Sequence, residues 1–577
     1  MRRREKWMAM LCLVFVVIQI YFDLRLPDYM TELTMLIKTS GTTADIANVG
    51  LKMLGCTTAS AVLAIACGYL AAKTASGFSF AVRDKLFHHV MDVGSEEMQD
   101  FSVPSLITRT TNDITQIQMI VAMGLQMMIK APIMAVWAII KILGKSRELS
   151  AVTAAFVIVL FVTLLAVMGL CIPRFRIVQK LTDKINRVAR ENLTGINVVH
   201  AFNAEEYQNE KFDTPSRDMM NLQMKNQKLF AIVSPTMTLG MNGLALAIYW
   251  VGAALVNNIA AADTAARLTM FSEVLVFSTY ATYIVMAFTM LAMIFLMLPQ
   301  AQVSAERINE VLERKASIRE GSVQSGKETG TVEFRNVSFR YPHASADELT
   351  DIDFKVNKGE TLAIIGATGS GKTTLVSLIP RFYDATEGEV LVDGVNVKDY
   401  TFDALYDKLG YVTQKAVLFS GTIRENVFFG ESAAAADDAE LNRAVELSRA
   451  KEFVDKLPEG TEYEIAQLGR NVSGGQKQRI SIARALAREP EILIFDDSFS
   501  ALDYRTDAKL REGLSRQLHE TTKIIVAQRI STIRHADKII VLEHGEIAGV
   551  GTHEELMQSC RMYREIATSQ LSASELA

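Results

Sequence analysis

The eight residues from Gly366 to Thr373 have the types and the spacing needed to hold phosphate groups. Glycines let a loop turn its backbone N–H groups towards phosphate oxygens, and a following helix adds partial positive charge. A lysine supplies a point charge, and a threonine hydroxyl is a ligand for Mg2+. The phosphate-binding set is Gly366, Ala367, Thr368, Gly369, Ser370, Gly371, Lys372, Thr373 and Thr374.

The flanking sequence supports the same interpretation. The apolar run at 361–365 is typical of a short buried strand, and the run at 374–379 is typical of a helix. The strand, the loop and the helix together form the pattern of a P-loop. The sequence therefore predicts that this chain binds a nucleoside triphosphate.

A carboxylate further along the chain is expected to take part in the same phosphate and magnesium binding. The apolar run at 492–495 ends in Asp496, which places a carboxylate at the C-terminal edge of a predicted strand. A carboxylate at that edge holds magnesium, partly through water, next to the bound phosphates. We expect Asp496 and Thr373 to share this ion.

The whole chain is too long for one domain and too apolar for an ordinary soluble protein. It has 577 residues, 49% of them hydrophobic and 22% charged, with a net charge of -5. This charge gives no indication of nucleic-acid binding. Four of the five cysteines lie in apolar runs, without metal or redox spacing, and are interpreted as packing residues.

The first half of the chain contains six apolar stretches long enough to span a membrane. The first follows a basic N-terminus and is also compatible with a cleaved signal peptide, but no small-residue cleavage site follows it. It is interpreted as a spanning helix. The stretches are Trp7–Phe22, Leu51–Ala72, Ile117–Ile142, Leu149–Ile172, Leu229–Val256 and Met270–Leu298.

Lysine and arginine residues concentrate in the N-terminus and in two long loops, 73–109 and 174–228. The positive-inside rule then places both termini and both loops in the cytoplasm. Apolar residues recur at three- and four-residue intervals at Val82–Met91 and Leu181–Val199, which predicts helices. The spanning helices are therefore expected to continue beyond the bilayer; solvated amphipathic helices are the alternative.

Ionisable residues inside spans are costly and face a cavity or a partner. Lys52, Lys141 and Glu273 lie near span ends and are interpreted as structural, whereas Lys130 lies near a span centre and is the cavity candidate. Four methionines of the sixth span recur at helical spacing, which suits either ordinary packing or a soft surface for apolar ligands. They are Met286, Met290, Met293 and Met297.

The composition changes after the sixth span. A polar Gly/Ser-rich stretch follows a charged helix, and predicted strands then alternate with helices, as in an α/β nucleotide-binding domain. We expect an all-α, six-helix transmembrane domain at 1–314, a linker at 315–330 and an α/β P-loop domain at 331–577.

The segment from Ser473 to Gln476 carries a resemblance to a known family. Its Ser-Gly-Gly-Gln core resembles the signature of the ATP-binding cassette (ABC) transporter family. With six preceding spans, the whole chain resembles an exporter-type half-transporter. The resemblance implies ATP and Mg2+ as cofactors, and two cassettes that meet head to tail.

The resemblance also implies roles for individual residues. Tyr341 resembles the aromatic residue that stacks on adenine, and Gln414 the glutamine that touches magnesium together with Thr373 and Asp496. The segment from Ser500 to Asp503 resembles the D-loop. The signature residues would contact the partner's ATP: Ser473, Gly474, Gly475 and Gln476.

Two residues depart from the family pattern. Asp497 stands where a glutamate usually polarises the attacking water, and Gln528 stands where a histidine is usual. Aspartate is one methylene shorter, and glutamine cannot become cationic near neutral pH. Either both changes weaken this chain's own ATP site, or they are neutral drift in a working site. His535 and His553 lie in segments resembling the family's C-terminal framework, and neither is expected to replace the missing histidine.

These observations predict an exporter subunit that pairs with a second half-transporter, expected to be a different chain with a complete catalytic pair. The substrate is expected to be an amphipathic drug or a lipid-like molecule. A homodimer with slow ATPase, and an ATP-binding regulator or channel, remain alternatives. The compact layout without a recognisable transit peptide favours a bacterial plasma membrane.

Overall fold

The structure is a computed structural model that describes residues 3–38, 41–94, 97, 100–143, 146–260, 263–430 and 437–571. The chain divides into two compact units. The helical unit comprises Met1–Val90 with Ser102–Arg314, and the α/β unit comprises Met91–Phe101 with Lys315–Ala577. The predicted fold class, an α-helical spanning part followed by an α/β part, is confirmed.

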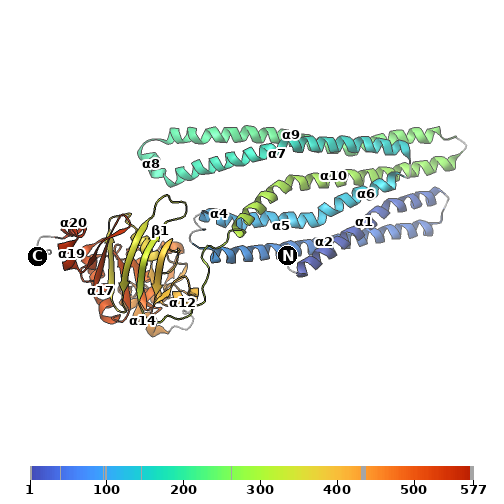
Figure 1. Ribbon diagram of the computed structural model, residues 1–577. Helices are drawn as coiled ribbons and strands as arrows, with labels where there is room; N and C mark the ends of the chain where they lie inside the picture. The colour runs from blue at the N-terminus through green and yellow to red at the C-terminus, as the bar shows by residue number, and fades with distance from the viewer. Residues whose placement is uncertain are drawn as a thin grey trace. The chain divides into compact units, whose positions relative to one another are not determined.

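Six helical segments of the described residues are long and apolar enough to cross a membrane, which confirms the six predicted spans. The longest, α9, has 54 residues, or about 80 Å at 1.5 Å per residue, against a hydrocarbon core of about 30 Å. The two segments predicted to be helical extensions lie in α2 and in α7 with α8. In Figure 1, α7 and α9 run side by side over most of their length. The helices are α1 (Arg3–Lys38), α2 (Thr43–Asp92), α4 (Val103–Thr108), α5 (Ile114–Met123), α6 (Ile129–Leu143), α7 (Arg147–Thr194), α8 (Ile196–Ala201), α9 (Glu205–Asn258) and α10 (Thr264–Leu312).

The third span is not a regular α-helix. It contains two π-helical turns, η1 (Arg109–Asp113) and η2 (Gly124–Met128). Pro132 has no N–H for the carbonyl of Met128, which lies four residues earlier and ends η2. A wider turn at this point accommodates the missing hydrogen bond.

Two lysines of the helical unit pair with aspartates of another helix. Lys130 of α6 lies 3.3 Å (Nζ to Oδ2) from Asp23 of α1, and Lys141 lies 2.7 Å (Nζ to Oδ2) from Asp28. The hydroxyl of Tyr280, on α10, donates to Asp28 at 2.7 Å. Lys130, the cavity candidate of the sequence, is therefore half of an ion pair. Its partner was missed because 107 residues separate the two.

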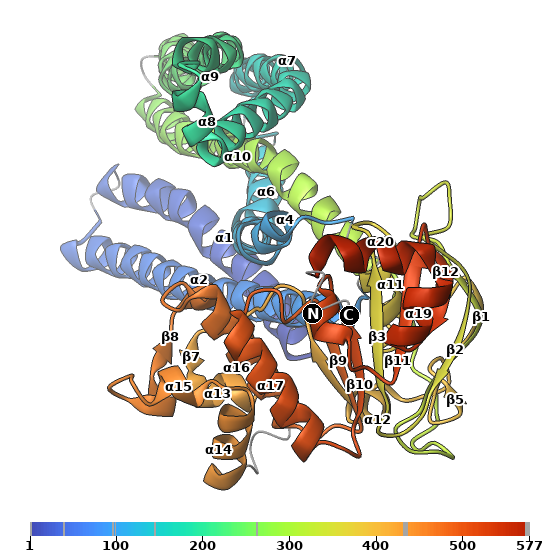
Figure 2. The ribbon, with the colours of Figure 1, turned by 90° about the vertical axis from the view of Figure 1, so that its left-hand side faces the viewer.

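The α/β unit contains a six-stranded sheet in the order β12-β11-β3-β10-β9-β6, in which all strands except the edge strand β12 run parallel. Successive side chains of β3 point to opposite faces. Leu362 and Ile364 pack in the core shared with β1 and β2, whereas Ala363 and Ile365 pack in the core shared with α14, α16 and α17. In Figure 2, α13–α16 lie on the side of the sheet away from β1 and β2. The strands of this sheet are β3 (Thr361–Gly366), β6 (Leu409–Val412), β9 (Ile492–Asp496), β10 (Thr522–Val526), β11 (Lys538–Glu543) and β12 (Glu546–Gly551).

A second, antiparallel sheet has the order β2-β1-β4-β5, and β7 pairs with β8. These strands are β1 (Val332–Phe339), β2 (Leu349–Val356), β4 (Glu387–Val392), β5 (Val395–Asn396), β7 (Gly421–Thr422) and β8 (Glu464–Ile465). The helices of the α/β unit are α11 (Lys372–Ser377), α12 (Phe402–Tyr406), α13 (Ile423–Val427), α14 (Asp438–Leu447), α15 (Lys451–Val454), α16 (Gly474–Leu486), α17 (Tyr504–Gln517), α18 (Ile530–Ile533), α19 (His553–Ser559) and α20 (Arg561–Gln570), with short 3-10 turns at Gly460–Glu462 and Gln467–Gly469.

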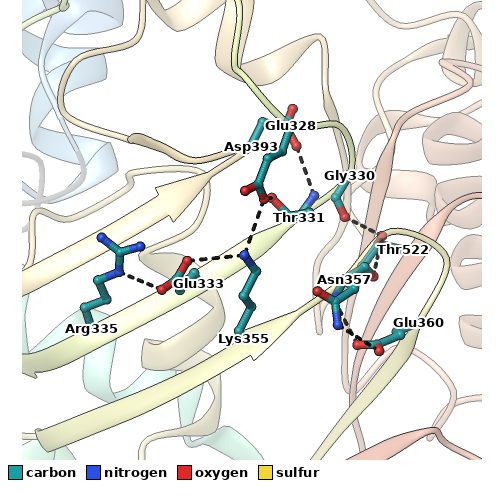
Figure 3. A network of polar contacts seen from close by, with 10 residues as sticks. All are labelled: Glu328, Gly330, Thr331, Glu333, Arg335, Lys355, Asn357, Glu360, Asp393 and Thr522. Carbon is teal, nitrogen blue, oxygen red and sulfur yellow. Dashed lines mark hydrogen bonds and ion pairs between the residues drawn. The ribbon is translucent and has the colours of Figure 1, made fainter.

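The stretch predicted as a linker runs along the α/β unit. Val323 forms a parallel bridge with Tyr400. Figure 3 shows how the end of this stretch is held: the backbone N–H of Thr331 donates to Asp393 at 2.9 Å, and the Thr522 hydroxyl donates to the carbonyl of Gly330. Asp393 is fully buried, so it anchors the entry to β1 inside the unit.

Candidate nucleotide site

Four neighbouring parallel strands end at one edge of the six-stranded sheet, and each has a predicted site residue at its end or just beyond it. Gly366 ends β3 and Asp496 ends β9, while Gln414 and Gln528 stand two residues beyond β6 and β10. The strands are adjacent in the order β3-β10-β9-β6. In open α/β sheets, ligands bind outside the carboxyl ends of the strands. The sheet therefore gathers residues separated by up to 162 positions in the sequence.

Glycines shape the P-loop for two different reasons. Gly366 is required by space, because a Cβ there would lie 2.2 Å from the carbonyl oxygen of Leu542. Gly369 and Gly371 are required by conformation, with φ of 80° and 91°. A Cβ added at Gly369 would meet no heavy atom within 4 Å, so this part of the loop is open.

Lys372 begins α11 directly after the loop. Its ammonium donates to the carbonyls of Gly366 at 2.9 Å and Ala367 at 2.7 Å. Burial lowers the pKa of Lys372 below its ordinary value, and the nearby Asp497 and Asp496 oppose that shift. A polyphosphate bound beside Lys372 would add negative charge and favour the ammonium form.

The oxygens expected to hold magnesium lie together. Thr373 donates its hydroxyl to Asp496 Oδ1 at 2.9 Å, which joins the two expected ligands. Burial is the largest cause of the raised pKa of Asp496, and the charge of Asp497 adds to it, while hydrogen bonds from Thr373 and Tyr411 oppose it. Two neighbouring carboxylates and a hydroxyl are hard oxygen groups that suit Mg2+. When bound, this ion would neutralise charge on the phosphates.

Asp497 is held by two amides. Its Oδ2 accepts a hydrogen bond from Gln528 Nε2 at 2.7 Å and another from Gln414 Nε2 at 3.2 Å. Asp497 is buried and has a left-handed φ of 47°. The two predicted catalytic positions, Asp497 and Gln528, therefore form one connected group with Gln414, one of the predicted magnesium contacts.

Gln528 is also fixed from a part of the chain that sequence reasoning missed. Gln570, the last residue of α20, donates its amide to the carbonyl of Gln528 at 2.8 Å. Its Oε1 accepts from the backbone N–H of Ile530 at 2.8 Å. No local pattern could reveal this contact, because the two glutamines are 42 residues apart.

Tyr341 follows β1 and reaches the P-loop helix. Its hydroxyl lies 2.9 Å from Thr374 Oγ1, and its ring packs edge-on against Phe339 and Tyr383. This arrangement holds the tyrosine beside the helix that follows the P-loop. Its stacking on adenine stays a prediction.

The signature residues begin a different helix. Ser473 caps α16: its Oγ accepts from the N–H of Gln476 at 3.4 Å, and Gln476 Oε1 accepts from the N–H of Ser473 at 2.8 Å. Gly474 and Gly475 form the first turn. A capped helix N-terminus with two glycines is suited to an anion, which is the chemistry that the prediction for the partner's ATP requires.

Comparison with known proteins settles the family. The family model of the ABC transporter transmembrane region matches residues 9–288, and the ABC transporter family model matches 349–500. An uncharacterized ABC transporter ATP-binding protein of Mycobacterium tuberculosis is 37% identical over 99% of this chain and 97% of its own length. The chain belongs to the ABC transporter family. This ABC transporter is thus a multi-pass membrane protein with a cytoplasmic nucleotide-binding unit, and its family binds ATP to drive transport.

Two further similarities describe the kind of transporter. An ATP-dependent lipid A-core flippase of Aromatoleum aromaticum is 31% identical over 87% of this chain and 82% of its own length. The structure of a bacterial Atm1-family ABC exporter with ATP bound superimposes with a TM-score of 0.80, at 23% identity and 99% coverage of both chains. This ABC transporter therefore has the exporter fold.

The stability of the α/β unit should depend on pH through His553. Its Nδ1 lies 2.7 Å from the Tyr563 hydroxyl, and burial, followed by Arg534, lowers its pKa below the ordinary 6.5. Below about pH 6.5 the unfolded chain binds this proton more readily than the folded chain, so acid destabilises the fold. The wild-type protein should lose melting temperature when the pH is lowered from about 7.5 to about 5.5. In His553→Gln this loss should be smaller by about 1 °C, measured in detergent. His519→Gln, at an exposed histidine, is the matched control, and an equal effect of both changes would contradict the prediction.

Proposed function

We propose that this ABC transporter is one half of a dimeric exporter, and that its own ATP site is slow and acts mainly as a clamp. The observation that carries the proposal is the group formed by Asp497, Gln528 and Gln414. It occupies the place where the family's catalytic glutamate and histidine are expected.

The short carboxylate is the first reason for slow turnover. Asp497 ends one methylene closer to the backbone than a glutamate, and both amides bind one of its oxygens. A misplacement of about 1 Å can cost roughly 100-fold in rate. Asp497 already accepts two hydrogen bonds from protein side chains, so fewer acceptor positions of its carboxylate remain for a water molecule.

The second reason is the lack of a titratable switch at position 528. Gln528 can hydrogen-bond a phosphate oxygen but carries no charge, and here its amide donates to Asp497 at 2.7 Å. The residues expected to bind phosphate and magnesium are retained: Lys372 donates to the carbonyl of Gly366, and Thr373 donates to Asp496. This combination favours holding ATP over cleaving it.

An intact signature beside a weakened catalytic pair favours a heterodimer. Ser473 and Gln476 form a complete capping box at the start of α16, ready to complete another chain's ATP site. A different partner with glutamate and histidine would then hydrolyse ATP at that site, with this chain supplying the signature. The expected membrane is the bacterial plasma membrane.

The substrate is proposed to be an amphipathic drug or a lipid-like molecule. A pocket of about 70 Å³ lies between the third span and α10. Methionines line much of this pocket, and their flexible thioether side chains suit apolar ligands of loosely defined shape. It is smaller than the roughly 300 Å³ of the smallest drug sites, which fits a binding surface completed by the second half-transporter. The methionines lining it are Met123, Met127, Met128, Met293 and Met297.

The test is to purify the chain alone and with candidate partner half-transporters, and to measure ATPase and transport in vesicles. Activity is expected only with a partner, and only while the partner keeps its own catalytic glutamate. The Lys372→Ala form of this chain should still allow its partner's site some turnover. A stable dimer of this chain alone with robust turnover would establish the homodimer instead. Nucleotide binding without transport in any combination would point to a regulator or channel.

A further inference from the structure

We propose that Cys12 and Cys67 are a redox-sensitive pair that forms a disulfide inside the membrane, joining α1 to α2. The two Sγ atoms lie 3.0 Å apart, and the side chains are 0% and 3% exposed. Each thiol also points at the other residue's backbone carbonyl, at 3.6 Å from Cys12 and 4.0 Å from Cys67. Sequence spacing gives no indication of the pair, because the residues are 55 positions apart.

The pair belongs to a consistent antiparallel contact between the two helices. Towards the N-terminus of α1, a Cβ at Gly77 would lie 3.0 Å from Glu5 Oε1. Towards its C-terminus, Ser60 donates its hydroxyl to Asp23. As the residue number rises on α1 it falls on α2, so the thiols meet within a register that is fixed on both sides.

Small buried residues line α2 on either side of this part of the contact. Cys67, Ala71, Ala75 and Ser79 recur every four residues on α2 and are all buried. Both cysteines lie inside long helices, so their meeting depends on how the helices are placed and not on flexible loops.

The separation suits a disulfide better than a metal ion. An S–S bond of about 2.05 Å requires the sulfurs to approach by about 1 Å. A tetrahedral metal with two thiolates at about 2.3 Å requires them to separate, to about 3.8 Å. No group of three or more His, Cys, Asp or Glu that could hold a metal occurs among the described residues.

The oxidant must be soluble in the bilayer. Cys12 stands five residues after Trp7, the start of the first predicted span, and Cys67 stands five residues before Ala72, the end of the second. At 1.5 Å per residue, both lie about 8 Å from the predicted cytoplasmic ends of their spans. A lipid-soluble organic hydroperoxide reaches this depth.

The reaction balances with one hydroperoxide for each pair. One thiol attacks the O–O bond and passes its proton to the departing oxygen, which releases the alcohol and leaves a sulfenic acid. The second thiol attacks that sulfur, forming the disulfide and releasing water. In sum, two thiols and one hydroperoxide give one disulfide, one alcohol and one water; the thiols lose two electrons and the O–O bond gains them.

The experiment uses the full chain in phosphatidylcholine–phosphatidylglycerol nanodiscs, treated with cumene hydroperoxide and then denatured and alkylated. Intact mass should show the alkylatable thiols falling from the five in the sequence to three, and a phosphine reductant should restore all five. Peptide mapping of the wild type should identify a Cys12–Cys67 link without any substitution. Five persistent thiols, or a link between other cysteines, would overturn the proposal.

Matched variants separate the pair from general oxidation. Cys12→Ser and Cys67→Ser should each retain all four remaining thiols after treatment. Cys171→Ser removes a buried cysteine of α7 and should still lose two thiols. Equal losses in all three variants would show non-specific oxidation and overturn the proposal. Thiol counting does not require ATP turnover, so its result is independent of the proposed function.

Discussion

Replacing Asp497 by glutamate and Gln528 by histidine together should raise ATP turnover at this chain's own site by about 100-fold, or about 2.7 kcal/mol in the barrier. The longer acid would extend beyond the position where both amides now bind Asp497 Oδ2. The histidine would restore a group that can become cationic near the phosphate. The measurement is single-turnover ATP hydrolysis by the purified transporter, with the partner's own catalytic glutamate changed to glutamine.

The single changes should do less than the pair. Asp497→Glu alone leaves Gln528 as an uncharged amide, and Gln528→His alone leaves the acid too short. The double change in a Lys372→Ala background is the control and should give no gain, because Lys372 is expected to bind the phosphates. A gain below about threefold from the double change would sink the idea that these two residues limit turnover.

Replacing Lys130 by methionine should destabilise the helical unit by about 3 kcal/mol. The change removes the ammonium at 3.3 Å from Asp23 Oδ2, where both side chains are only 19% exposed. The partly buried carboxylate of Asp23 then lacks a counter-charge, although Ser60 still donates to it. Thermal or denaturant unfolding of the full chain in detergent measures the loss.

Two variants test whether pairing is the cause. Adding Asp23→Asn to Lys130→Met should recover most of the loss, since no unpaired charge remains. Lys52→Met is the matched control: Lys52 lies 3.7 Å from Glu32, both are about half exposed, and such pairs contribute under about 1 kcal/mol. A double variant no more stable than Lys130→Met alone would show that the lysine stabilises by packing.

Much of the nucleotide site follows from local sequence patterns. The P-loop requires glycine where φ is positive, at Gly369 and Gly371, and where a Cβ has no room, at Gly366. Asp496 ends a strand whose five residues are all buried, so its place at the sheet edge could be predicted from the apolar run before it. Such features depend on backbone conformation over a few residues, so a short stretch of sequence is enough to predict them.

The contacts that set the chemistry depended on tertiary structure. The sharing of Asp497 by Gln414 and Gln528 arises because β6, β9 and β10 are neighbours in the sheet, an order that does not follow the chain. The hydrogen bond from Gln570 to the carbonyl of Gln528 depends on where α20 packs. Neither contact has a local signal.

By itself, the sequence of this ABC transporter determined its two kinds of unit, its six spans and the glycine-rich loop expected to bind phosphate, because hydrophobic length and local spacing express these features. Only the tertiary structure decided which charges and thiols meet inside the membrane. The pairs Asp23–Lys130 and Cys12–Cys67 depend on the rotation and register of whole helices. These quantities are fixed by packing between distant segments, and no short stretch of sequence contains them.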